Sequence, residues 1–202
     1  LMVAVYAQMD KIMLGKMLDT TAVGLYSVGI YICNLWNFVP NAVIVSLRPG
    51  ILQAKQYNEE LYVKKLKQMY AIIIWLSILY AAIVCLFSKY IIWILYGEDF
   101  LGARIPMMIA VWYCGFSLLG GAREVWIISE NLQKYSKWYA LTGALTNLIL
   151  NFLLIPQWGM TGAAVATLIT QIMTGFLVTL PLKETRVNNK YLVEALFLKG
   201  IW

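Results

Sequence analysis

QMYAIIIWLSILYAAIVCLF, at residues 68–87, decides the fold class of this chain. The run contains no charged side chain, and at about 1.5 Å per residue its length matches the bilayer's hydrocarbon core of about 30 Å. Similar apolar runs lie at about 22–47, 103–129, 134–155 and 159–181. Because a helix satisfies its own backbone hydrogen bonds in lipid, the sequence predicts an all-α, polytopic membrane protein.

The composition supports the same class. The chain has 202 residues, of which 61% are hydrophobic, and its mean hydropathy is +0.72. Soluble domains are typically about 45–50% apolar. No polar stretch is long enough to fold alone, so we expect no separate soluble domain.

The positive charges indicate how the chain crosses the membrane. The net charge is +6, and the cations cluster at the ends of apolar runs, which favours a topological role over a nucleic-acid partner. The cation-rich segments are 48–68, 129–137 and 183–190, and the opposite set holds only Lys16, Lys89 and Arg104. The positive-inside rule therefore predicts that the first set, and with it the C-terminus, faces the cytoplasm.

Several kinds of chemistry find no support in the sequence. The chain has no histidine, the commonest metal ligand and general base. Its three cysteines lie inside apolar runs without a CxxC spacing, which is typical of buried hydrophobic residues. It lacks the phosphate-binding loop, HExxH and GxSxG motifs. We therefore predict that it is not an enzyme and that it has no metal or other cofactor.

The helix predicted over 22–47 carries a polar stripe. Asn34, Asn37 and Asn41, with Arg48 beyond them, are spaced by three, four and seven residues, so at about 100° per residue they share one face. Asparagine is costly against lipid. The stripe therefore lines a substrate cavity or, alternatively, packs against another helix. Pro40 removes a backbone hydrogen bond, so we expect a hinge there.

Two further pairs of charged residues interrupt apolar runs. Arg123 and Glu124 lie deep in the run at 103–129, and Asp10 and Lys11 interrupt the first run. Ionisable residues at such depth are functional candidates. Arg123 either binds a phosphate or sugar carboxylate or, alternatively, forms a structural ion pair or snorkels to the inner interface. Asp10 is either an exposed helix-end charge or a protonation or cation site.

The two ends of the chain differ from the spans. The first apolar run, at about 1–14, is too short to cross a bilayer, so we expect its helix to begin upstream of Leu1. Residues 1–182 are expected to form a transmembrane bundle and 183–202 a cytoplasmic tail. Residues 48–68 are expected to be a loop, and 88–100 either extend the preceding helix or lie flat at the interface.

Four segments together resemble a known superfamily. They are DKIMLGKMLDTTAVGLYSVGIYICNLWNFVP (10–40), LYGEDFLGA (95–103), WIISENLQKYS (126–136) and NFLLIPQWGMTGAAVATLIT (151–170). They resemble the oligosaccharide flippases among the multidrug, oligosaccharidyl-lipid and polysaccharide exporters. The nearest branch is the O-antigen and capsule repeat-unit flippases, and the chain resembles the second half of that fold.

This resemblance implies a second six-helix lobe of a MATE-like fold. It also implies movement of undecaprenyl-diphosphate-linked oligosaccharides across the bacterial cytoplasmic membrane for surface polysaccharide synthesis. The expected partners are the lipid-linked oligosaccharide, membrane lipids and the polymerase machinery, with no nucleic acid. The alternatives are a multidrug or cation antiporter of the same superfamily, and a non-transporting, truncated membrane subunit.

Overall fold

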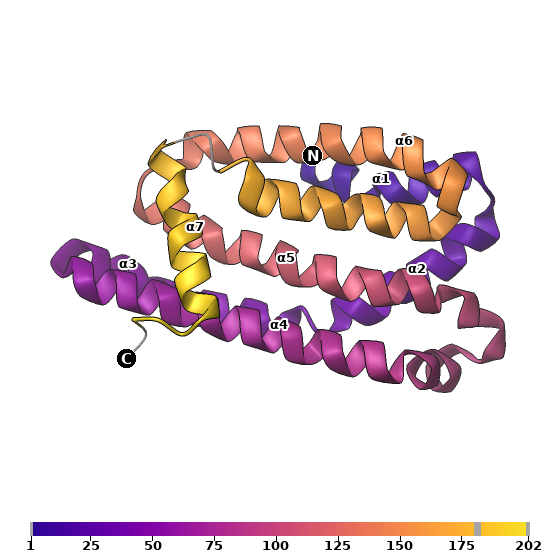
Figure 1. Cartoon of the computed structure of the whole chain (residues 1–202), viewed down its shortest axis with the longest axis horizontal. Helices are drawn as coiled ribbons and strands as arrows, with labels where there is room; N and C mark the ends of the chain where they lie inside the picture. Colours follow the sequence, from indigo (N-terminus) through magenta and orange to yellow (C-terminus); the bar gives the residue numbers. More distant parts are fainter. Residues whose placement is uncertain (1, 180–182, 201–202) are drawn as a thin grey trace.

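The computed structural model describes residues 2–179 and 183–200, and within these ranges it contains helices and no strands. The helices are α1 (Met2–Met17), α2 (Thr20–Leu35), α3 (Phe38–Tyr57), α4 (Glu59–Tyr96), η1 (Glu98–Ala103), α5 (Arg104–Ser129), α6 (Gln133–Ile172), η2 (Met173–Leu177) and α7 (Lys183–Leu196). The long helices run along one axis, and α7 crosses them near one end (Figure 1). Among the described residues, four helical stretches are long and apolar enough to span a membrane. The all-helical membrane bundle is therefore confirmed.

The helix predicted over 22–47 is interrupted at Trp36 and Asn37, where α2 ends and α3 begins. Pro40 explains this position. It has no N–H to donate to the carbonyl of Trp36, four residues earlier. The N–H of Val39 lies 3.1 Å from that carbonyl instead, which tightens the turn. The break is thus one turn before Pro40, and the use of Pro40 as a hinge stays a prediction.

The prediction of a loop at residues 48–68 is wrong. Helix α3 continues to Tyr57, and only Asn58 separates it from α4. The backbone of Asn58 is extended, with φ −154°, and its side chain accepts a hydrogen bond of 2.9 Å from the N–H of Leu61, so it caps α4. Residues 88–96 extend this helix, which is the first of the two predicted alternatives. Gly97 ends α4 with φ +88°, a conformation that favours glycine.

Helix α6 holds the two runs predicted at 134–155 and 159–181. It folds back at Gly159, where φ is +56° and ψ −133°, and Figure 1 shows its two arms antiparallel. The amide of Asn147 reaches the hydroxyl of Thr167 across this hairpin, at 3.0 Å. A β-carbon on Gly162 would lie 2.2 Å from the carbonyl oxygen of Leu154, so the close approach of the arms requires glycine there.

The largest apolar cluster joins α3, α4, α5 and α7. Tyr70, fully buried on α4, donates a hydrogen bond to Asn188 of α7, and Lys67 forms an ion pair with Glu194. Helix α7 is therefore docked on the bundle. Elsewhere large apolar side chains face outward, such as Leu86 and Ile94, which are 76% and 71% exposed. Such a surface suits contact with lipid.

Candidate functional site

Asp10 is buried, with 9% of the residue exposed, and its carboxylate lies where three helices meet. The hydroxyls of Tyr26, on α2, and Thr167, on the second arm of α6, both donate to its Oδ2 at 2.7 Å. The amide of Asn151, on the first arm of α6, donates to Oδ1 at 2.7 Å. One carboxylate thus joins α1, α2 and both arms of α6.

These hydrogen-bond partners of Asp10 are all neutral. Among the described residues, no lysine or arginine forms an ion pair with Asp10. Its neighbour Lys11 lies over the ring of Tyr31, 5.0 Å from the centroid. Burying a carboxylate without a cation is costly, and short hydrogen bonds offset only part of that cost. Among the described residues, the buried charge of Asp10 is therefore stabilised by neutral hydrogen-bond donors.

A second layer of amides surrounds this carboxylate. Asn147 accepts a hydrogen bond of 3.0 Å from Asn151 and donates one to Thr167. The Oδ1 of Asn151 is buried and has no hydrogen-bond partner in the described part of the chain. Carboxylate, amide and hydroxyl oxygens are the ligands that hard cations prefer. This oxygen-lined group carries a single negative charge, so its chemistry suits a monovalent cation; we call it the Asp10 cluster (Asp10, Tyr26, Asn147, Asn151 and Thr167).

The sequence identified only part of the Asp10 cluster. Asp10 was a candidate because it interrupts an apolar run. Asn147 and Asn151 lie four residues apart in one apolar run and Thr167 lies in the next, a pattern that favours ordinary helix packing. No feature of the sequence marked Tyr26 as a candidate. Asn147 and Asn151 meet Thr167 because α6 folds back at Gly159, and the sequence pattern did not predict that contact.

Arg123 is also buried, with 6% exposed, but its partners are backbone carbonyls. Its Nη1 donates to the oxygens of Thr174 and Gly175, at 2.7 and 3.2 Å. These residues lie in the π-helical turn η2, where the backbone departs from the α-helical pattern. The guanidinium also lies over the ring of Tyr139, 4.7 Å from its centroid. Glu124 accepts a hydrogen bond of 3.1 Å from Ser136.

The polar stripe lies at the surface of the bundle. Asn34 and Asn41 are exposed and Asn37 is half-buried. Asn37 donates to the side chain of Asn34 at 2.9 Å, and Asn41 donates to the carbonyl of Asn37 at 2.8 Å. From another helix, the thiol of Cys114 lies 3.8 Å from Asn34. Arg48, further along, is exposed too. The stripe therefore presents amides outward, and its predicted role in a cavity stays a prediction.

Comparison with known proteins identifies the family. Residues 1–104 match the sequence model of a family described as polysaccharide biosynthesis protein. The chain belongs to this family. The match covers all of α1 to α4 and η1, and so includes Asp10 and the polar stripe. No curated protein and no solved structure matches the chain. Family membership, together with the membrane-type helices, supports a role in polysaccharide biosynthesis at a membrane.

Proposed function

We propose that this chain belongs to a flippase that moves undecaprenyl-diphosphate-linked oligosaccharide repeat units across the bacterial cytoplasmic membrane. In this proposal no covalent bond changes, so the protein is a transporter rather than an enzyme. The observation that carries the transport role is the Asp10 cluster. A helical anchor has no need of a buried carboxylate without a cation, whereas transporters use intramembrane ionisable groups on ion pathways.

The substrate's charged head group requires a lined path, because a charge in hydrocarbon costs several kcal/mol. The polar stripe of Asn34, Asn37 and Asn41 supplies outward-facing amides, and Arg48 and Lys11 supply positive charge for a diphosphate. In the proposed MATE-like arrangement this face lies opposite a first lobe, residues 1–182 form the second lobe, and 183–202 form the cytoplasmic tail. The polymerase machinery would then take up the translocated units.

The Asp10 cluster provides a means of coupling. A bound proton or cation removes or offsets the negative charge that Tyr26, Thr167 and Asn151 now stabilise. Those three donors come from α2 and the two arms of α6, so the packing between α1 and its neighbours would differ between the free and bound states. A ligand shifts a conformational equilibrium only through such a difference in affinity.

The same cluster supports a second candidate, a multidrug or cation antiporter of the superfamily, because such a transporter needs a titratable carboxylate. Family membership favours the flippase. The test reconstitutes the purified full-length protein in vesicles that contain a fluorescent undecaprenyl-diphosphate oligosaccharide on the inner leaflet. Reagent-accessible sugar should appear outside only with the protein. Absence of transfer, with export of a cationic dye under an ion gradient, would support the antiporter instead.

A further inference from the structure

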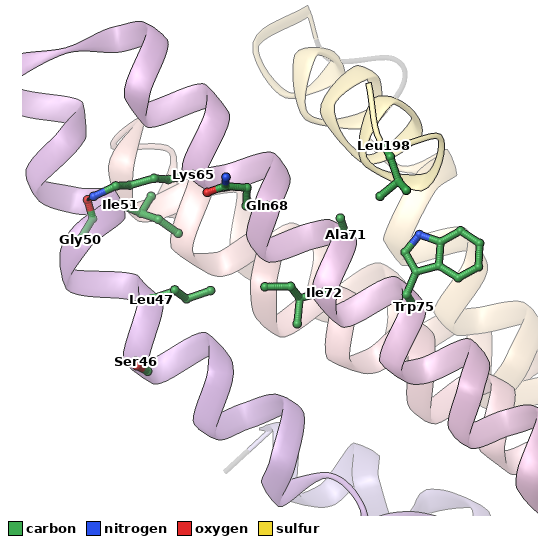
Figure 2. A pocket seen from close by; sticks show the side chains of 10 residues that line it. All are labelled: Ser46, Leu47, Gly50, Ile51, Lys65, Gln68, Ala71, Ile72, Trp75 and Leu198. Carbon is green, nitrogen blue, oxygen red and sulfur yellow. Dashed lines mark hydrogen bonds between the residues drawn. The ribbon is translucent and has the colours of Figure 1, made fainter. Parts of the chain in front are cut away.

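A cavity of about 550 Å³ lies between α3, α4 and the segment that follows α7. Figure 2 shows Gly50 and other residues of α3 on one wall, Lys65, Ile72 and Trp75 along α4, and Leu198 from the C-terminal segment. Lys65 and Trp75 are ten residues apart on one helix, a distance of about 15 Å. The cavity is therefore elongated along α4.

The two ends of this cavity differ in chemistry. Lys65 lies at one end, half-buried, just before the apolar run of α4. Its ammonium reaches the carbonyl oxygen of Gly50 at 3.3 Å, a long hydrogen bond, and no ion pair involves Lys65 among the described residues. The other end, with Ile72 and the half-exposed Trp75, is apolar. The cavity thus has one cationic end and a long apolar body.

The surrounding charge is also positive. Residues 48–67 contain five cations, Arg48, Lys55, Lys64, Lys65 and Lys67, against two carboxylates, Glu59 and Glu60. Lys55 pairs with Glu59 and Glu130, and Lys67 pairs with Glu194. Arg48, Lys64 and Lys65 have no ion pair in the described part of the chain. An anion at this end would meet uncompensated positive charge.

We propose that this cavity binds one anionic phospholipid, with its phosphate at Lys65 and one acyl chain along Ile72 and Trp75. The order of these features matches that of a membrane, because Lys65 lies outside the apolar run and Trp75 lies within it. A soluble anion would leave the apolar body empty. The charge pattern of the chain places this end at the cytoplasmic leaflet, where anionic lipids are abundant. The inference does not depend on which substrate the protein transports.

The test measures lipid binding to the purified full-length protein in a neutral detergent, by native mass spectrometry, with phosphatidylglycerol and phosphatidylcholine as probes. Phosphatidylglycerol should bind at least about fivefold more tightly. Lys65→Gln should remove about fivefold of that affinity. The matched control is Lys64→Gln, which removes the same charge from the adjacent position outside the cavity and should change affinity by less than about twofold.

A second variant tests the apolar body of the cavity. Ser46 lines the wall and is exposed, so Ser46→Phe should fold normally, fill part of the space and weaken binding of phosphatidylglycerol. Inorganic phosphate at millimolar concentration should not displace the lipid. The proposal is overturned if the two phospholipids bind equally, if Lys64→Gln and Lys65→Gln weaken binding equally, or if free phosphate competes.

Discussion

Among the residues that the structure describes, the bundle buries two charged side chains, Asp10 and Arg123, and their surroundings are opposite in kind. Asp10 is held by side chains from α2 and both arms of α6. Arg123 is held by two backbone carbonyls of η2 and by an aromatic ring. Those carbonyls belong to the backbone of the π-helical turn η2.

This difference distinguishes the site that the proposed mechanism uses for coupling from a contact that supports the fold. Among the described residues, neutral donors surround the negative charge of Asp10, and the proposed transport mechanism uses this charge as its coupling site. Arg123 donates to two backbone carbonyls of η2, which is a structural task. The buried Nε of Arg123, which has no partner among the described residues, leaves some capacity for a ligand. Substrate binding by Arg123 therefore remains a prediction, and the contacts favour the structural alternative.

The largest expected effect comes from Asp10→Asn. The substitution keeps the shape and removes the charge, so the protein should fold and reach the membrane while transport falls at least about tenfold. A loss of this size corresponds to about 1.4 kcal/mol or more of coupling free energy. Surface polysaccharide in cells and transfer in vesicles measure activity, and the melting temperature in detergent measures folding.

The matched control for this variant is Asp19→Asn. Asp19 is exposed and caps α2 by accepting a hydrogen bond of 2.7 Å from Ala22. Asparagine caps a helix about equally well, so this variant should keep full activity. If Asp10→Asn transports normally, Asp10 has no role in transport that distinguishes it from Arg123, and the Asp10 cluster is ordinary packing.

Arg123→Ala is expected to act on stability first. It leaves the carbonyls of Thr174 and Gly175 without their donor, which costs about 1–3 kcal/mol, and thermal unfolding in detergent measures that loss. Arg123→Lys should recover part of it, because an ammonium can still reach one carbonyl. A fully stable Arg123→Ala protein that has lost transport would assign Arg123 to the substrate and remove the contrast with Asp10.

The sequence predicted the helices from hydrophobicity but misjudged where they end. Residues 48–68 were expected to be a loop because they are polar. Yet they are rich in good helix formers such as glutamine, lysine and leucine. Asn58 followed by Glu59 and Glu60 is a helix start signal, and the structure places the junction there. The polar residues of 48–68 show where the chain leaves the apolar layer of the membrane. The cap at Asn58 shows where α3 ends and α4 begins.

The candidate site was predictable only at its charged centre. Asp10 interrupts an apolar run and is visible at once, whereas its partner Thr167 is 157 positions away in the chain. Hydrophobic periodicity carries no information about such pairings. Arg123 was equally easy to identify as a candidate in the sequence. Its partners could not be predicted, because they are backbone carbonyls, which every residue type carries.

Cysteine labelling along the polar stripe is a further test of the transport role proposed from the Asp10 cluster. If α2 and α3 line a watery path, single cysteines at 34, 37 and 41 should react with a hydrophilic thiol reagent, and 37 should react most slowly because Asn37 is half-buried. Cysteines at 35 and 39 should stay unlabelled. Leu35 is 68% exposed, so its protection would come from lipid. The three natural cysteines are replaced by alanine beforehand, and equal labelling at all five positions would reject the watery path.

The smallest effect is expected at a third charge, Glu194 on α7, which has an ordinary cationic partner. Its hydrogen bond to Lys67 lowers the pKa of Glu194 below the usual range, and the nearby positive charge of Lys190 acts in the same direction. Because the pKa is lower in the folded state, the stabilisation is present above the unfolded-state pKa of about 4.3. It is lost as the pH falls through the lower pKa of the folded protein.

Hydrogen exchange of residues 183–196 tests this ion pair without involving transport. At pH 7, Glu194→Gln should exchange modestly faster than the wild type, because α7 loses one contact to α4 while Tyr70 still holds Asn188. Once the pH has fallen below the folded-state pKa of Glu194, the two proteins should exchange alike, because Glu194 is then protonated in both the folded and unfolded states. Transport at pH 7 should be unchanged. Glu194 has a cationic partner, whereas Asp10 forms no ion pair among the described residues. If loss of the Glu194 charge leaves transport unchanged and loss of the Asp10 charge stops it, this difference in partners is what distinguishes the Asp10 cluster.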